Sequence, residues 1–168
     1  ITERTRAEKY ERFRNRVLEL LAGDAPLSGT LEAIVQGVEQ LNPGMLCSIL
    51  LLDGEGKRLG NGVAPSLPDF YKTAIDGLEI GVGVGSCGTA AFTGDRVVVD
   101  DIATHPYWTP YRELAASAGL GACWSQPVRS SSGQTLGTFA IYHQKAHALM
   151  ESDIALMEKT ASLVSIAI

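Results

Sequence analysis

Apolar residues recur at helical spacing at both ends of the chain. Near the start they lie three or four positions apart among charged residues, which predicts a helix over residues 2–22: Tyr10, Phe13, Val17 and Leu20. A similar stripe predicts a helix over residues 27–41, which Asn42-Pro43-Gly44 ends. The last helix is expected from about Leu149 to the final residue, with a heptad-like stripe: Met150, Ile154, Met157, Ala161, Val164 and Ile168.

Between these helices, apolar runs and turn signals predict antiparallel strands. A buried strand over residues 45–52 and a weaker one over 57–64 flank the hairpin signal Asp53-Gly54-Glu55-Gly56. A second hairpin is predicted from strands 121–129 and 135–143, with a short strand at 97–100 and short helices within 65–76 and 111–118. Because hairpins require antiparallel pairing, the pattern predicts an α+β domain with helices against a central antiparallel sheet.

The segment from Gly81 to Trp124 has the character of a ligand-binding segment. Its glycines allow close approach of a backbone or a ligand, and residues 100–108 have no clear period. Long irregular segments inside a domain are more often functional than filler. We expect a tight turn and a short helix after Gly88 to line one wall of a pocket, with N-terminal amides that suit an anion.

Three glycines in this segment also fit a dinucleotide-binding fingerprint, Gly83-x-Gly85-x-x-Gly88. That motif works where a strand, a full helix and a second strand follow each other within about 30 residues. Only residues 89–96 separate the last glycine from the next apolar run, and a parallel crossover needs about 10–12 residues. The spacing therefore disfavours a dinucleotide site.

Composition and charge narrow the class of protein further. A chain of 168 residues with 45% apolar residues suits a single globular domain over residues 1–168. The net charge of −5, with no basic patch, gives no basis for a nucleic-acid partner or for contact with an anionic membrane. No run of 18 apolar residues predicts a membrane span. Three cysteines without a C-x-x-C pair indicate a reducing cytoplasm and no zinc site: Cys47, Cys87 and Cys123.

The two ends of the chain suggest a module within something larger. The last apolar stripe continues to Ile168 without a cap or a polar tail. We therefore expect the chain to be a segment of a longer protein. Terminal helices of heptad character further predict a homodimer formed through them, with an output domain covalently attached.

Taken together, these motifs resemble the GAF domain family. The anchors are 85–91 (Gly-Ser-Cys-Gly-Thr-Ala-Ala), 98–108 with its Asp100-Asp101 pair, 121–128 and 136–140. The chain looks most like GAF domains beside cyclic-di-GMP enzymes or sensor histidine kinases of bacteria. The resemblance implies a sheet of about six antiparallel strands, with terminal helices on one face. A ligand pocket on the other face would be covered by the middle segment.

The resemblance and the residue types together suggest a set of ligand-binding side chains. Aromatic residues of the middle segment are expected to form a lid, and polar residues of the strands to face the pocket from the sheet. We assign no catalytic residue and no metal ligand, and the cofactor is unknown. The candidates are Cys87, Thr89, Asp101, His105, Tyr107, Trp108, Tyr111, Cys123, Ser125 and Thr138.

Alternative functions remain open within the family. Some GAF domains reduce free methionine-R-sulfoxide, and Cys87 is the candidate thiol here, although Cys47 and Cys123 are not in the expected contexts. Either His105 or His143 suits a haem or metal sensor. The Cys-His dipeptide that usually attaches a bilin is absent. Cyclic-nucleotide binding has no supporting motif. We favour a non-catalytic sensory domain.

Overall fold

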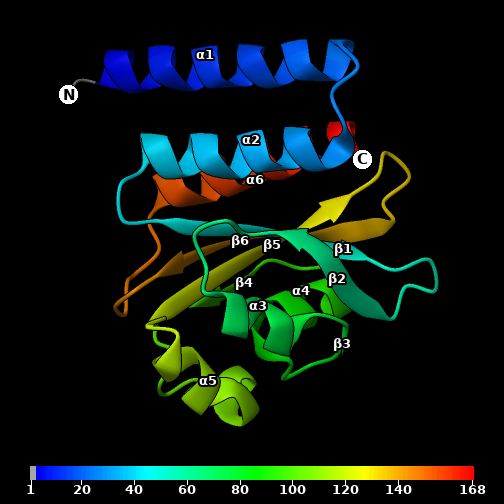
Figure 1. The fold of residues 1–168 in the computed structure, drawn as a ribbon. Coiled ribbons are helices and arrows are strands. Elements are labelled where there is room, and N and C mark those ends of the chain that lie inside the picture. Colours follow the sequence, from blue (N-terminus) through cyan, green and yellow to red (C-terminus); the bar gives the residue numbers. More distant parts are fainter. Residues whose placement is uncertain (1–2) are drawn as a thin grey trace.

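A six-stranded antiparallel sheet forms the middle layer of the computed structural model, which describes residues 3–168 (Figure 1). The strands are β1 (Leu46–Leu52), β2 (Arg58–Val63), β3 (Leu78–Glu79), β4 (Val97–Val99), β5 (Ala122–Arg129) and β6 (Thr135–His143). Their order across the sheet is β3-β2-β1-β6-β5-β4. The two predicted hairpins thus form its two halves, and β1 pairs with β6 at the centre. The α+β fold is confirmed.

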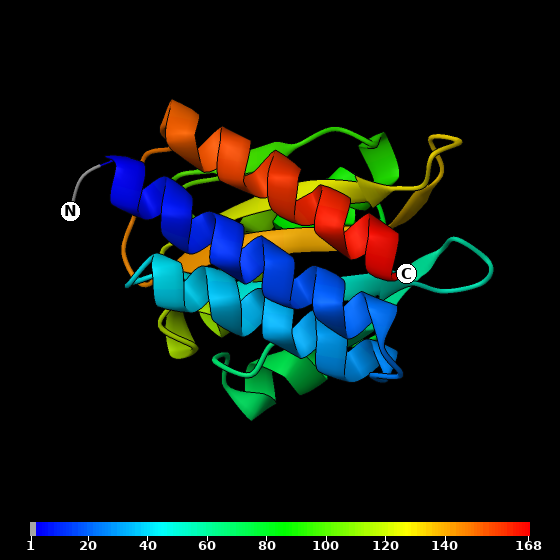
Figure 2. The ribbon, with the colours of Figure 1, turned by 90° about the horizontal axis from the view of Figure 1, so that it is seen from above.

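Helices from both ends of the chain cover one face of the sheet. They are α1 (Glu3–Ala22), α2 (Leu27–Leu41) and α6 (Glu151–Ala167). Figures 1 and 2 show α2 and α6 side by side on the sheet, while α1 lies over them in an outer layer and runs roughly along α2. The core beneath is apolar and includes Ile34, Trp124 and Met157, each fully buried. The predicted start of α1 at Thr2 lies outside the described residues.

The opposite face of the sheet carries the middle of the chain (Figure 1). Its short helices are α3 (Asp69–Ile75), α4 (Gly85–Thr93), the 3₁₀ helix η1 (Pro106–Tyr111) and α5 (Arg112–Ser117). Alternation along β5 places Cys123 in the core of this face, whereas its neighbour Trp124 belongs to the core beneath the terminal helices. The site-forming segment is therefore separated from the chain ends by the sheet.

Two local features of the middle segment differ from the sequence prediction. The helix expected after Gly88 begins earlier, at Gly85, whose positive φ of 59° turns the chain into α4. The segment expected to be irregular contains η1, because the Nδ1 of His105 accepts a hydrogen bond from the amide of Tyr107 (3.1 Å) and caps its first turn. Strand β3 was not predicted, since it has only two residues at the sheet edge.

The apolar stripes of the terminal helices are used largely inside the domain. On α6, Met157, Ala161 and Val164 are buried against the sheet, whereas Met150 and Ile168 at the two ends are 66% and 45% exposed. On α1, Val17 is buried in the same core. The centre of the α6 stripe is thus intramolecular, so the heptad pattern alone does not establish a dimer. In residues 3–168 no helix combines the length and the apolar character that a membrane span requires.

Candidate functional site

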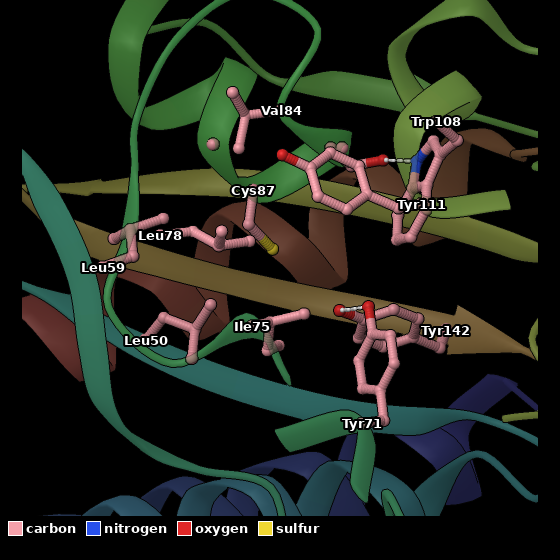
Figure 3. Close-up of a pocket in the computed structure, with 13 residues that line it drawn as sticks. Leu50, Leu59, Tyr71, Ile75, Leu78, Val84, Cys87, Trp108, Tyr111 and Tyr142 are labelled. Atoms are coloured by element: carbon pink, nitrogen blue, oxygen red, sulfur yellow. Dashed lines mark hydrogen bonds between the residues drawn. The ribbon is translucent and has the colours of Figure 1, made fainter. Parts of the chain in front are cut away.

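A small pocket lies between the sheet and the segments that cover its open face (Figure 3). It has a volume of about 40 Å³. A single water needs about 10–15 Å³ measured in this way, so the pocket holds a molecule of a few heavy atoms. Its walls are mostly apolar side chains, with the exceptions described below: Leu50, Leu59, Tyr71, Ile75, Leu78, Val84, Gly85, Ser86, Cys87, Gly88, Trp108, Tyr111 and Tyr142.

Ser86 on α4 connects the sheet to Trp108 on η1, which together with Tyr111 forms the lid of this pocket. Its hydroxyl accepts a hydrogen bond from the indole Nε1 of Trp108 (3.0 Å) and donates one to the carbonyl of Cys123 (2.9 Å). All three groups are buried, so these bonds are shielded from competing water. The sequence analysis identified Trp108 but missed Ser86, because nothing in a small serine next to a glycine indicates such a tertiary contact.

A pair of tyrosines closes another side of the pocket. The hydroxyls of Tyr71 on α3 and Tyr142 on β6 are 3.0 Å apart, and the rings meet edge to face at 5.9 Å (Figure 3). Burial raises the pKa of both phenols well above the usual value, so both stay neutral. The sequence analysis missed both residues. Strand alternation offered a signal for Tyr142, because it lies four positions from the candidate Thr138 on the same strand.

Two thiols lie beside each other between α4 and the sheet. Cys87 lines the pocket, and Cys123 behind it is fully buried. A hydrogen bond with the Cys123 thiol is the main cause that lowers the pKa of Cys87, and the hydroxyls of Ser125, Thr138 and Tyr142 act in the same direction against burial. Burial raises the pKa of Cys123. The pair therefore loses its first proton from Cys87.

Two of the predicted polar residues are buried without a hydrogen-bond partner. The hydroxyls of Ser125 and Thr138 are fully shielded from solvent, and neither meets a partner at hydrogen-bond geometry. Both nevertheless lie close enough to Cys87 to lower the pKa of its thiol. A buried hydroxyl without a hydrogen-bond partner lowers the stability of the fold. Packing alone therefore does not explain why these two positions carry hydroxyls.

The lid contains two of the predicted aromatic residues. Trp108 is 3% exposed, and Tyr111 packs edge to face against it with 6.5 Å between ring centroids. Both line the pocket. Tyr107 lies outside it, beside the His105 ring at 4.7 Å.

The remaining predicted residues make local contacts. The Thr89 hydroxyl donates to the carbonyl of Gly85 (2.7 Å) and accepts from the amide of Gly83 (3.1 Å), which fixes the turn into α4. A carboxylate oxygen of Asp101 accepts from the amide of Ala103 (3.1 Å) in its own loop. None of the pocket-lining side chains belongs to these two residues.

The histidines considered as iron ligands do not line the pocket. His105 caps η1, as described above. The His143 ring stacks on the His147 ring at 4.0 Å and packs against Trp124, which belongs to the core beneath the terminal helices. Among residues 3–168, no three or more His, Cys, Asp or Glu side chains are grouped so as to hold a metal ion.

His143 predicts a pH dependence of stability. Burial lowers its pKa from 6.5, the His147 ring lowers it further, and Asp153 acts in the opposite direction. As the pH falls, His143 of the unfolded chain is therefore protonated near pH 6.5, before His143 of the folded chain. The stability that neutral His143 contributes is thus fully present above about pH 6.5 and is lost as the pH falls below this value. We expect the unfolding temperature to decrease over this range, and His143→Phe to reduce the decrease. A pH profile of His143→Phe identical to that of the wild-type protein would contradict the assignment.

Comparison with known proteins identifies the family to which this chain belongs. The model of the GAF domain family matches residues 24–168, and the chain belongs to this family. The methyl sulfide methyltransferase-associated sensor of Methanosarcina acetivorans is 42% identical over 168 residues, which are 100% of this chain and 17% of that protein. The chain therefore spans about a sixth of the length of this curated relative.

Solved structures share the fold at low sequence identity. A GAF domain superposes with a TM-score of 0.74 at 19% identity, covering 96% of this chain and 88% of the other. The free methionine-R-sulfoxide reductase of Neisseria meningitidis, solved with its substrate, gives a TM-score of 0.68 at 19% identity, covering 94% and 87%. At this identity the likeness concerns the fold alone.

Proposed function

We propose that this GAF domain is a sensory module that binds a small uncharged molecule in the pocket under Trp108 and Tyr111. The pocket itself carries the proposal. It lies on the face of the sheet away from the chain ends, is about 40 Å³ in volume, and combines apolar walls with the Cys87 thiol and the Tyr71–Tyr142 hydroxyl pair. Apolar walls with a few placed polar groups are typical of ligand sites. The relative from Methanosarcina acetivorans is also named a sensor.

The size and lining of the pocket favour a volatile or gas-sized ligand. Within residues 3–168 as described, neither a carboxylate nor a basic side chain lines the pocket, so a charged ligand would lose hydration without gaining a counter-ion. Methyl sulfides have few heavy atoms, apolar methyl groups and a soft sulfur atom. The name of the relative associates it with a methyl sulfide methyltransferase. We therefore propose a methylated sulfide as the first ligand to test.

Dimethyl sulfide is expected to raise the unfolding temperature of the reduced protein, since a ligand of the folded state stabilises it by mass action. Ile75→Phe, which enlarges a side chain that lines the pocket, is expected to abolish this effect. The matched control Leu27→Phe changes an exposed residue at the start of α2, on the other face of the sheet, and leaves the effect unchanged. A shift that persists in Ile75→Phe, or no shift at all in the wild-type protein, would refute the proposal.

The reductase alternative fits this pocket less well. Free methionine sulfoxide is an amino acid with two charged groups, whereas the pocket has room for only a few heavy atoms and, among the described residues, no carboxylate or basic side chain lines it. We propose that the domain is not itself a catalyst. Turnover of free methionine-R-sulfoxide in an NADPH-coupled assay, lost in Cys87→Ser, would instead establish the enzyme.

Signalling requires a route from the pocket to the chain ends. We propose that the ligand favours one position of the lid and that the sheet passes this bias to the terminal helices, to which a cytoplasmic output domain is attached. The output domain is proposed to be a cyclic-di-GMP enzyme or a histidine kinase. Such a ligand shifts an equilibrium only by its difference in affinity for the two states.

A homodimer through the terminal helices remains part of the proposal. Because Val164 is buried in the core, Val164→Glu would unfold the domain rather than separate two copies. The exposed Ile166 on α6 is the better site. Light scattering at micromolar concentration is expected to show a dimer for the wild-type chain and a monomer for Ile166→Glu. A monomeric wild-type chain would contradict this.

A further inference from the structure

The paired thiols of the pocket wall and the sheet point to a chemistry that ligand binding does not require. Cys87 on α4 and Cys123 on β5 lie in the same buried core between these two elements, and each thiol affects the pKa of the other. The neighbouring residue Ser86 fixes the same two elements together through its 2.9 Å bond to the Cys123 carbonyl. The two elements that carry the thiols are thus packed against each other at these residues, which is the first requirement for a disulfide.

Only one of the three thiols is open to the pocket. Cys87 is 8% exposed and lines the pocket, whereas Cys123 and Cys47 are fully buried and line none of it. Cys47 belongs to the core on the helix-covered face of the sheet. Hydrogen peroxide has two heavy atoms, about the size of two waters, and therefore fits a pocket of about 40 Å³.

The surroundings of Cys87 favour its thiolate. The hydroxyls of Ser125 and Thr138 are fully buried and have no hydrogen-bond partner. By strand alternation with Cys123 and Tyr142, they face the side of the sheet on which Cys87 lies. Hydroxyls without a partner are available to donate to a thiolate, and would also stabilise a hydroxide that leaves a peroxide. Lowering of the Cys87 pKa by the same groups agrees with this reading.

We propose that Cys87 is a modification site for small uncharged peroxides, and that Cys123 resolves the product as a disulfide. The Cys87 thiolate attacks one oxygen of hydrogen peroxide, the O–O bond breaks, and Cys87 becomes a sulfenic acid. The departing hydroxide takes up the proton that the thiol lost and leaves as water. The Cys123 sulfur then attacks the Cys87 sulfur, the S–O bond breaks, and the hydroxyl leaves as a second water with the Cys123 proton.

This reaction changes the pocket directly. A disulfide between Cys87 and Cys123 removes the thiol from the wall and ties α4 to β5 covalently. Because Ser86 beside it holds Trp108 of the lid, oxidation acts on the same elements that surround the ligand. The domain thereby gains a redox input. This input is independent of the proposed ligand, since it requires only the two thiols and a peroxide.

The test treats the reduced, folded protein with one molar equivalent of hydrogen peroxide. Remaining thiols are then alkylated under denaturing conditions, and peptides are mapped by mass spectrometry. We expect a Cys87–Cys123 disulfide and an alkylated Cys47. Cys87→Ser is expected to leave Cys123 reduced, and Cys47→Ser, the matched control, to react like the wild-type protein. In Cys123→Ser, dimedone is expected to trap the sulfenic acid at Cys87; Cys123→Ala serves if that variant does not fold.

The rates separate a built site from general oxidation. Cys87 is expected to react at least about tenfold faster than Cys47. As long as the pH lies below the pKa of a thiol, each unit by which that pKa falls raises the thiolate fraction about tenfold. Equal rates for the two thiols, or oxidation of Cys87 only after unfolding in urea, would overturn the proposal. Failure of dimethyl sulfide to bind would not, because the thiol chemistry is read from covalent products alone.

Discussion

Trp108→Ala is expected to lower the free energy of unfolding by about 3–5 kcal/mol and to enlarge the pocket. The indole is 3% exposed, packs against Tyr111, and donates its Nε1 hydrogen to Ser86. Removing it leaves a void next to the pocket and a buried hydroxyl without its donor. Urea denaturation measures the loss, and binding of molecules larger than dimethyl sulfide to the folded variant measures the enlargement.

The exposed aromatic Phe92 provides a control for this change. It lies on α4 and is 60% exposed, so Phe92→Ala is expected to shift the free energy of unfolding by at most about 0.5 kcal/mol. If Trp108→Ala were as mild as Phe92→Ala, the lid would be no part of the core, and the pocket would have to be open in solution.

Gly137→Ala is expected to destabilise the domain by about 3 kcal/mol or more. Gly137 lies on β6 between β1 and β5, and a Cβ there would collide with the backbone carbonyl of Leu50. Backbone at the centre of a sheet cannot move aside without breaking the β1–β6 ladder. Urea denaturation, or loss of soluble protein on expression, checks this.

Gly54→Ala is the matched control for the sheet glycine. It lies in the turn between β1 and β2, where a Cβ meets nothing within 4 Å and no positive φ is required. We expect no measurable destabilisation. A Gly137→Ala variant as stable as Gly54→Ala would show that β1 and β6 separate more readily than their pairing suggests.

The predictable part of the structure depends on short-range signals. The hairpins at Asp53 and at Ser130 follow from turn residues between apolar runs, and those signals need no knowledge of the rest of the chain. The terminal stripes likewise predicted α1 and α6. They did not reveal which partner each stripe meets, since a heptad pattern that packs on a sheet resembles one that packs on a second copy.

The site was less predictable because its groups come from distant parts of the chain. Trp108, Tyr111 and Cys87 were proposed from residue type and line the pocket. Tyr71 and Tyr142 meet only after α3 folds onto β6, and no local pattern marks that encounter. His105 was considered as a ligand on residue type, yet its position before Pro106 also suits a helix cap, which is how the structure uses it.

The central pairing of β1 with β6 has a consequence for how the chain folds. The hairpins β1–β2 and β5–β6 need only short loops, but Leu46 pairs with Tyr142 across most of the sequence. Closing so long a loop costs chain entropy before any contact offsets it, and topologies rich in such contacts fold slowly, in milliseconds to seconds. The two hairpins are therefore expected to form first, and their docking along β1 and β6 to limit the folding rate. During synthesis on the ribosome, β1 is expected to stay unpaired with β6 until nearly the whole domain has emerged.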